Sequence, residues 1–306
     1  MTNTRAVLRA FALTSAGIVM ITGCLSSAAQ EAQPRKAVDY NYLLPWDKKG
    51  TRVPATVEGQ KWEPFQIFDN VYYVGPQGSS SYVLKTGKGL ILIDPAYDYT
   101  AETVLQNIRK VGLNPADIKY ILLTHGHWDH SAGVKIIQKA SDARVGMTAA
   151  DWDIYEKPLA EHRYETIPRD MVLKEGDVIK LGETTLRLHV TPGHTPGCLS
   201  MEYTVYDKGK PYRALTLGGL GFNFSEEWTK PYIASIKRMR DVPDVRVLLP
   251  DHQQVNDVFE LGKKIASRKP GEPNPFVQSR EAVLGWFDEV LKAAQEKDRL
   301  EMASRK

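Results

Sequence analysis

Thr124-His125-Gly126-His127-Trp128-Asp129-His130 is the stretch that decides the fold of this chain. It directly follows residues 120–123, a short apolar run that predicts a strand buried on both faces. Three of the seven histidines of the chain fall within six residues here. Imidazole and carboxylate groups are common zinc ligands, and a tight turn after a strand can project several of them into one space.

The spacing of these residues suggests how they divide between ions. His125 and His127 are two residues apart, so an extended backbone places both imidazoles on one face. Asp129 and His130 follow where the chain turns, and they can reach a second ion. A histidine-rich surface loop is the alternative interpretation, but such a loop does not usually end a fully apolar strand.

The surrounding pattern predicts sheets packed together with helices outside them. Helical spacing of apolar residues predicts helices at 103–111 and 276–294. No internal linker or short-period repeat interrupts the chain, so residues 40–306 are predicted to form one domain. The pattern does not define the strand order. Further strands are predicted at 65–68, 71–74, 81–84, 90–93, 178–179, 185–190, 199–205 and 245–249.

The H-x-H-x-D-H motif resembles that of the metallo-β-lactamase superfamily. Two further segments are similar to motifs of that family, namely P-G-H-T-P-G around His194 and the apolar strand that ends in Pro250-Asp251-His252. The resemblance runs from about Trp62 to Gln253. It implies an α/β fold of the αββα sandwich type, in which two mixed sheets lie face to face with helices outside.

The resemblance also implies a ligand set. His194 would complete a first zinc site with His125 and His127, and His252 would join Asp129 and His130 at a second. An Asp-His-His second site without cysteine is similar to that of the subclass B3 enzymes. Two Zn²⁺ ions and the opening of a β-lactam ring by a zinc-bound hydroxide, which Asp129 orients, are therefore expected, and with them a role in antibiotic resistance.

Four residues near the motifs have weaker assignments. Asp94 ends a buried strand, where it either hydrogen-bonds a ligand or the metal loop, or forms a turn before Pro95. Cys198 is expected to be a small buried residue rather than a ligand. His162 and His189 have no place in the motifs.

The segment at 217–225 departs from the family pattern. Glyoxalase II-like and lactonase-like relatives supply a bridging aspartate there, whereas this chain has neither Asp nor Cys. The absence leaves the subclass B3 ligand set as the closest fit, and a β-lactam is the expected substrate, although the serines that usually hold a β-lactam carboxylate are also missing. The alternative is another hydrolase of the same fold that acts on an ester, lactone or thioester. Asn223 and Ser225 are predicted to contact substrate, unless they are merely turn residues. Since Gly219 offers no side chain, Gly219→Ser is expected to improve turnover of carboxylate-bearing lactams.

The first residues resemble an export signal. Arg5 and Arg9 accompany an apolar stretch at 11–21 that is too short to span a bilayer, and small residues precede Cys24 as in a bacterial lipobox. We expect a signal peptide at 1–23, lipidation of Cys24, a tether at 24–39 and a periplasmic protein held to the membrane by its lipid alone. The alternative is a plain signal cleaved after Ala29, which leaves the protein soluble in the periplasm.

Composition restricts the partners. Residues 1–23 carry two arginines and no acid, so their removal lowers the formal net charge from +3 to +1. A net charge this small does not indicate a nucleic-acid partner. With Cys24 lipidated or removed, Cys198 has no partner for a disulfide. A small-molecule substrate is the expected partner. No G-x-S-x-G or S-x-x-K motif supplies a protein nucleophile. A non-catalytic lipoprotein that binds metal or a partner is the remaining alternative.

Overall fold

The structure is a computed structural model that describes residues 40–46 and 54–305. The predicted signal peptide, Cys24 and the tether lie outside the described residues. The chain divides after residue 36, and everything described belongs to the unit Ala37–Lys306. Within the described part of the chain, no helix is both long and apolar enough to cross a membrane.

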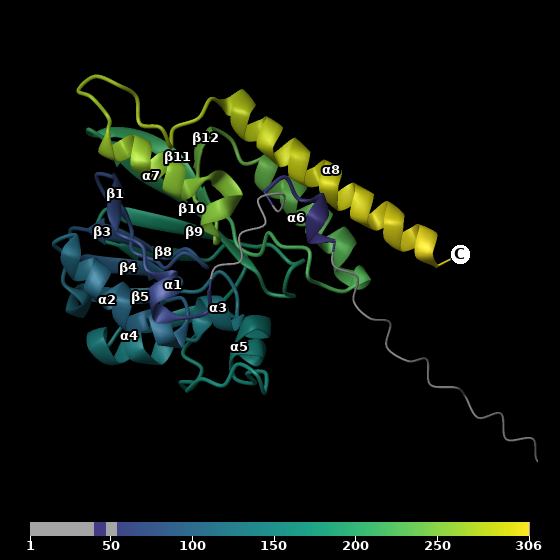
Figure 1. Ribbon diagram of the computed structural model, residues 1–306, viewed down its shortest axis with the longest axis horizontal. Helices are drawn as coiled ribbons and strands as arrows, with labels where there is room; N and C mark the ends of the chain where they lie inside the picture. The colour runs from purple at the N-terminus through teal and green to yellow at the C-terminus, as the bar shows by residue number, and fades with distance from the viewer. Residues whose placement is uncertain (1–39, 47–53, 306) are drawn as a thin grey trace, which may run out of the picture. The chain divides into compact units, whose positions relative to one another are not determined.

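The first sheet has seven strands that follow the order of the sequence (Figure 1). Its first half is antiparallel, and from the fourth strand onward the neighbours run parallel. The strands are β1 (Phe65–Phe68), β2 (Val71–Tyr73), β3 (Tyr82–Thr86), β4 (Gly89–Ile93), β5 (Ile118–Leu122), β6 (Arg144–Thr148) and β7 (Met171–Leu173).

The second sheet has five strands in the order β12-β11-β10-β9-β8. Only β11 and β12 run parallel, and the other neighbours are antiparallel. The strands are β8 (Val178–Leu181), β9 (Thr184–Val190), β10 (Leu199–Asp207), β11 (Lys210–Thr216) and β12 (Val245–Leu248).

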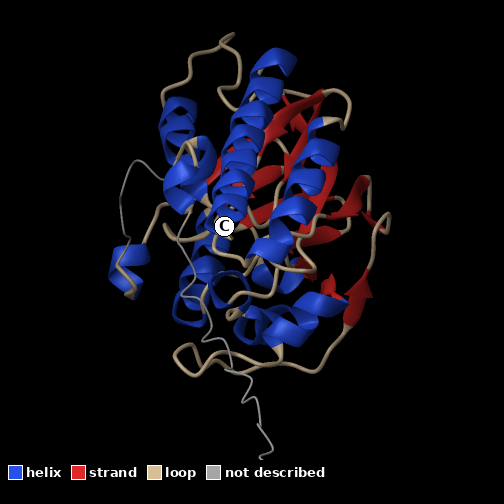
Figure 2. Cartoon of the chain, turned by 90° about the vertical axis from the view of Figure 1, so that its right-hand side faces the viewer, coloured by secondary structure: helices blue, strands red, loops and turns tan. Residues whose placement is uncertain are grey.

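Alternating side chains build three apolar layers. On β4, Ile91 and Ile93 face the second sheet, whereas Leu90 and Leu92 face the helices on the other side. A third layer lies between the second sheet and the helices α6 and α8, as at Leu248. The order is therefore helix, sheet, sheet, helix, and the predicted αββα fold is confirmed. Figure 2 shows helices in front of the strands.

The helices flank these sheets. The long ones that cover the second sheet carry apolar residues at helical spacing, such as Val283, Phe287 and Val290 on α8. The helices are α1 (Val57–Gln60), α2 (Ala101–Lys110), α3 (Trp128–Ser131), α4 (Val134–Ser141), α5 (Ala149–Tyr155), α6 (Thr229–Arg240), α7 (Val258–Ala266) and α8 (Arg280–Ser304).

The last helix differs from its prediction at both ends. It begins after Ser279, whose side chain accepts a hydrogen bond from the backbone N–H of Ala282, and this cap excludes Phe276 from the helix. Phe276 instead packs in the layer between the sheets. The helix continues to Ser304 because Lys297 and Glu301 are buried and paired with each other.

Three strands, β6, β7 and β11, are not predicted by the sequence pattern. The first half of β11, residues 210–213, is polar and partly exposed, so no apolar run predicts a strand there. It nevertheless lies between β10 and β12, where pairing with both neighbours fixes it as a strand. Tertiary pairing overrides a weak local pattern here.

The sequence motifs with the candidate ligands directly follow the ends of strands. β4, β5 and β6 are parallel, so the segments that follow them leave the first sheet at the same edge. β11 and β12 are likewise parallel, and the motifs with His194 and His252 follow β9 and β12. The loops at this edge therefore carry all the predicted ligands.

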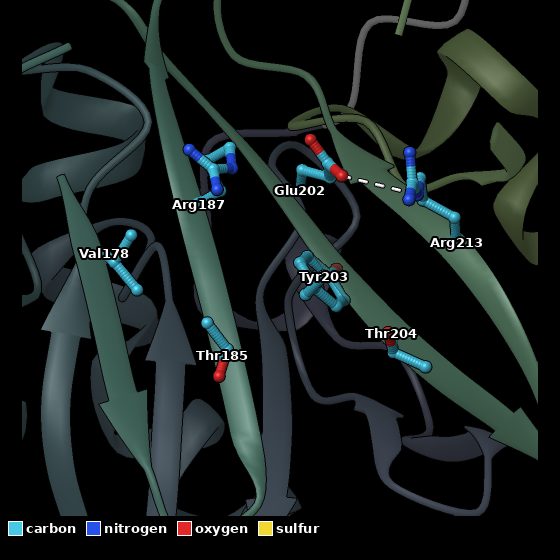
Figure 3. A pocket seen from close by; sticks show the side chains of 7 residues that line it. All are labelled: Val178, Thr185, Arg187, Glu202, Tyr203, Thr204 and Arg213. Carbon is cyan, nitrogen blue, oxygen red and sulfur yellow. Dashed lines mark ion pairs between the residues drawn. The ribbon is translucent and has the colours of Figure 1, made fainter. Parts of the chain in front are cut away.

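A pocket of about 160 Å³ lies elsewhere, on the second sheet (Figure 3). Glu202 in this pocket pairs with Arg213 at 3.4 Å and with His189 at 3.2 Å, so its charge is satisfied by neighbours on the sheet. None of the predicted ligands lines it. The lining residues are Val178, Thr185, Arg187, Glu202, Tyr203, Thr204 and Arg213.

Candidate metal centre

Three histidines from two loops meet at one edge of the sandwich. The ring centres of His125, His127 and His194 are 4.7–4.9 Å apart in every pair. The Nδ1 atom of His127 lies 2.9 Å from the Nε2 atom of His194. These three side chains could hold one metal ion between them.

Hydrogen bonds on the far side of two of these rings fix where their protons lie. His194 donates from Nδ1 to the carbonyl oxygen of Gly221 at 3.0 Å, so its Nε2 carries a lone pair. The Thr124 hydroxyl donates to Asp94 at 2.6 Å, and it therefore accepts from Nδ1 of His125 at 3.1 Å. The Nε2 atom of His125 is buried and has no hydrogen-bond partner.

A second group lies beside the first. Asp129, His130 and His252 bring one carboxylate oxygen and two Nε2 atoms together at separations of 3.2–3.6 Å. Two nitrogens bound at 2.0–2.1 Å to one tetrahedral ion are about 3.3 Å apart. The separations in this group match that spacing.

The proton positions in the second group call for a positive charge. His130 donates from Nδ1 to Asp94 at 2.9 Å, and His252 donates from Nδ1 to the carbonyl oxygen of Gly78 at 2.6 Å. When both rings are neutral, as metal binding requires, their Nε2 atoms carry lone pairs that face each other at 3.2 Å. Two facing lone pairs repel unless a proton or a metal ion lies between them. The donor set fits divalent metal.

The electrostatics separate the histidines into two kinds. Burial lowers the pKa of His194 to about 3, and burial together with the neighbouring His130 lowers the pKa of His125 well below its usual value. Burial also acts to lower the pKa of His130, but the carboxylates of Asp129 and Asp94 outweigh it and raise that pKa well above normal. His125 and His194 are neutral and ready to bind metal, whereas His130 must lose a proton first.

Asp94 combines the two roles considered for it. It adopts a left-handed backbone conformation, with φ of 54°, at the turn before Pro95. Its carboxylate accepts from the backbone N–H and the hydroxyl of Thr124 and from His130. It thus orients the loop that follows β5 as well as one candidate ligand.

Asp151 was missed by the sequence reasoning, although it ties the two histidine motifs together. Its buried carboxylate accepts from the N–H of Gly126 at 3.0 Å and from the hydroxyls of Thr195 and Thr148 at 3.1 and 3.2 Å. A Cβ on Gly197 would lie 2.5 Å from this carboxylate. The only local signal was T-x-x-D at 148–151, which is typical of a helix start.

Asp251 is a second missed residue. The segment 217–225 contains no acid, but the carboxylate of Asp251, which follows β12, accepts the N–H of Gly219 at 2.5 Å. Its partner is 32 residues away in the sequence, so the motif comparison within 217–225 could not find it. The absence of an acid in that segment therefore does not leave this part of the site without a carboxylate.

Gly219 cannot accept the serine that the sequence suggested. Its φ is +70°, and a Cβ would lie 2.3 Å from the Cys198 sulfur and 2.8 Å from Cβ of His194. Cys198 is itself fully buried, as expected. The expectation that Gly219→Ser improves turnover is wrong, because any side chain would displace a candidate ligand.

We expect Gly219→Ala to destabilise the fold markedly more than Gly112→Ala. Both glycines have positive φ, but a Cβ on Gly112 would meet nothing within 4 Å. Gly112→Ala therefore has only the conformational cost of a left-handed alanine, about 1–2 kcal/mol. Gly219→Ala has this cost and, in addition, the cost of the steric clash. Urea unfolding of both variants measures the difference, and equal losses would contradict the close contact.

The remaining predicted residues lie around this centre or away from it. The side-chain oxygen of Asn223 lies 2.8 Å from the position a Cβ of Gly221 would take, and Asn223 is exposed. Ser225 is exposed and precedes the short helix Glu226–Trp228. His162 stacks on Trp128 with ring centres 3.9 Å apart. His189 pairs with an acid on the second sheet.

Comparison with known proteins agrees with this geometry. The model of the metallo-β-lactamase superfamily matches residues 74–207. The solved structure of BJP-1, a subclass B3 metallo-β-lactamase of Bradyrhizobium japonicum, is 32% identical with a TM-score of 0.72, over 81% of this chain and 97% of that one. FEZ-1 of Legionella gormanii is 26% identical with a TM-score of 0.71, over 78% and 98%.

A sequence relative carries a different name. The hydroxyacylglutathione hydrolase of Cereibacter sphaeroides is 29% identical over 192 residues, which cover 54% of this chain and 70% of the relative. Because BJP-1 is matched at 32% identity over almost its whole length, and the family motifs meet in one site, the chain belongs to the metallo-β-lactamase superfamily.

Proposed function

We propose that the protein is a zinc-dependent hydrolase with two ions per chain that opens β-lactam rings. The observation that carries the proposal is the second group, in which the Nε2 atoms of His130 and His252 lie 3.2 Å apart beside the carboxylate of Asp129. The similarity to subclass B3 structures over most of their length supports the lactam substrate. A role in antibiotic resistance would follow from that activity.

Each residue of the proposed active site has a distinct role in hydrolysis. Bound zinc ions would supply an acidified water and polarise the substrate carbonyl. Although burial opposes it, the charge of His130 holds the pKa of Asp129 well below normal, so Asp129 is ionised and can accept a hydrogen bond from the attacking water. Asn223, exposed beside Gly221, can donate to a carbonyl or carboxylate of the substrate. Ser225 is the second proposed substrate contact.

Thioester or ester hydrolysis is the second candidate. The name of the Cereibacter sphaeroides relative favours it. The segment 217–225 contains no acid, but the carboxylate of Asp251 reaches it at Gly219, so the missing aspartate does not exclude such a substrate. Both candidates use the same metal ligands. They differ only in the substrate that fits above them.

A substrate panel separates the candidates. We expect zinc-loaded protein to hydrolyse at least one of a penicillin, a cephalosporin and a carbapenem above the background of His194→Ala, and to cleave a lactone and an acyl thioester more slowly. Initial rates at matched protein and zinc concentrations give the comparison. Thioester cleavage without lactam turnover would replace the first candidate by the second.

Export and lipidation are a separate proposal. Since residues 21–24 resemble a lipobox, we expect the full-length protein to fractionate with membranes and Cys24→Ala to be released or left uncleaved. Membrane fractionation followed by immunoblotting checks this. A wild-type protein found free in the periplasm would instead support cleavage after Ala29.

A further inference from the structure

The buried carboxylate of Asp251 lies against the candidate ligands without a full set of partners. The side chain is 1% exposed. One oxygen, Oδ2, accepts the N–H of Gly219, and the other, Oδ1, has no hydrogen-bond partner. A carboxylate offers about four acceptor sites, so most of its capacity is unused.

No lysine or arginine among residues 54–305 forms an ion pair with this carboxylate. Within residues 54–305, its one ion-pair contact is with His125, at 3.8 Å between Oδ2 and Nδ1. A buried carboxylate oxygen without a hydrogen-bond partner is costly, and a bound cation would satisfy it.

The position of Asp251 suits such a cation. One of its oxygens, a nitrogen of His130 and a nitrogen of His252 all lie within 4.8 Å of one another. Ligand atoms on one ion, with bonds of about 2.1 Å, are separated by roughly 3.0–4.2 Å. The distances between the ligand atoms of Asp251, His130 and His252 would therefore shorten by less than about one ångström on binding an ion.

The number of carboxylates at the metal centre also supports a role for Asp251 in metal binding. Asp94 and Asp129 contact His130, and Asp251 adds a third buried or half-buried carboxylate. Three carboxylates would leave a pair of divalent ions with a formal excess of +1, which one hydroxide neutralises. Without Asp251 the excess would be +2.

We infer that Asp251 is an additional metal ligand, which binds through Oδ1 the ion that His130 and His252 hold. The N–H of Gly219 anchors Oδ2 and leaves Oδ1 free. This ion would then have two nitrogen and two carboxylate ligands from the protein. The inference rests on the proposed metal-dependent function and extends its ligand set.

Metal titration of the chelator-stripped full-length protein tests the inference. Competition with a chromophoric chelator gives the affinities for two successive zinc ions in wild type and in Asp251→Asn. The amide keeps an oxygen for the N–H of Gly219 but loses the charge. Asp151→Asn is the matched control, because Asp151 is also a buried aspartate that accepts a backbone N–H of the site.

We expect Asp251→Asn to weaken one of the two zinc affinities by more than about a hundredfold, beyond the loss typical of a residue that only supports a ligand. The control should change either affinity by less than about tenfold. The metal-free Asp251→Asn protein should melt no lower than metal-free wild type, because the amide oxygen still accepts the N–H of Gly219. A lower melting temperature with unchanged zinc affinities would make Asp251 purely structural and overturn the inference.

A crystal structure of zinc-loaded wild type gives a check that needs no variant. An Oδ1–zinc distance near 2.1 Å supports the inference, and one beyond about 3 Å overturns it. If wild type binds no metal at all, the proposed function fails together with the inference. If wild type binds two ions and Asp251→Asn matches it, only the inference fails.

Discussion

His194→Ala is expected to lower kcat/KM at least a thousandfold, which corresponds to about 4 kcal/mol of transition-state stabilisation. His194 provides one of three nitrogens in the first group, and its Nε2 lone pair is directed there by the hydrogen bond to Gly221. Without it the ion would keep two protein ligands. The bound metal should fall by close to one ion per chain after dialysis.

His189→Ala is the matched control for this variant. It removes an imidazole only five residues away, on β9, where His189 pairs with Glu202 and faces no candidate ligand. Elemental analysis gives the metal content of both variants, and steady-state kinetics gives their kcat/KM. We expect both quantities to fall in His194→Ala and to stay unchanged in His189→Ala. Full turnover in His194→Ala, or equal losses in the two variants, would contradict the assignment of His194 as a ligand.

Asp151→Ala should reduce the free energy of unfolding by about 2–5 kcal/mol. The change leaves the N–H of Gly126 and the hydroxyl of Thr195 without their acceptor, and each unsatisfied buried donor costs about 1–3 kcal/mol. Asp151→Asn keeps one acceptor oxygen, and its amide can donate to a threonine hydroxyl. Urea unfolding should therefore rank wild type and Asp151→Asn well above Asp151→Ala.

The same carboxylate makes stability depend on pH. Burial, its largest influence, raises the pKa of Asp151 from the usual 3.8 to about 6. The folded state therefore binds more protons than the unfolded state between these values, and stability falls as the pH rises from about 4 to 6. At about 1.4 kcal/mol per pKa unit, the loss amounts to roughly 3 kcal/mol.

Asp151→Asn cannot titrate at this position. The difference in unfolding free energy between the variant and wild type should grow in favour of the variant from about pH 4 to 6 and then stay constant. Unfolding curves recorded with a chelator present throughout exclude effects of metal release. Parallel pH profiles for the two proteins would show that the carboxylate is not held in its raised state.

The fold class and the candidate ligands could be predicted from the sequence because their signals are local. His125, His127, Asp129 and His130 follow one apolar strand within six residues, and such a cluster at a strand end has few uses other than binding metal. His194 and His252 come within short motifs of the same family. Alternating apolar residues likewise gave most of the strands.

Weak local patterns failed for a physical reason. β11 is polar in its first half and becomes a strand only by pairing between β10 and β12. The start of α8 depends on the cap at Ser279 rather than on the apolar spacing that begins at Phe276. In both cases a contact outside the periodic pattern decides the boundary.

The sequence by itself thus determined the layered fold and which residues are the candidate metal ligands. Only the tertiary structure decided what surrounds them. Asp151 reaches partners 25 and 44 residues away, and Asp251 reaches Gly219 across 32 residues. The positive φ of Gly219 and its contact with Cys198 are equally invisible in the sequence. Such contacts arise because parallel strands end at one edge of the sandwich, and nothing in the local sequence specifies which loops meet there.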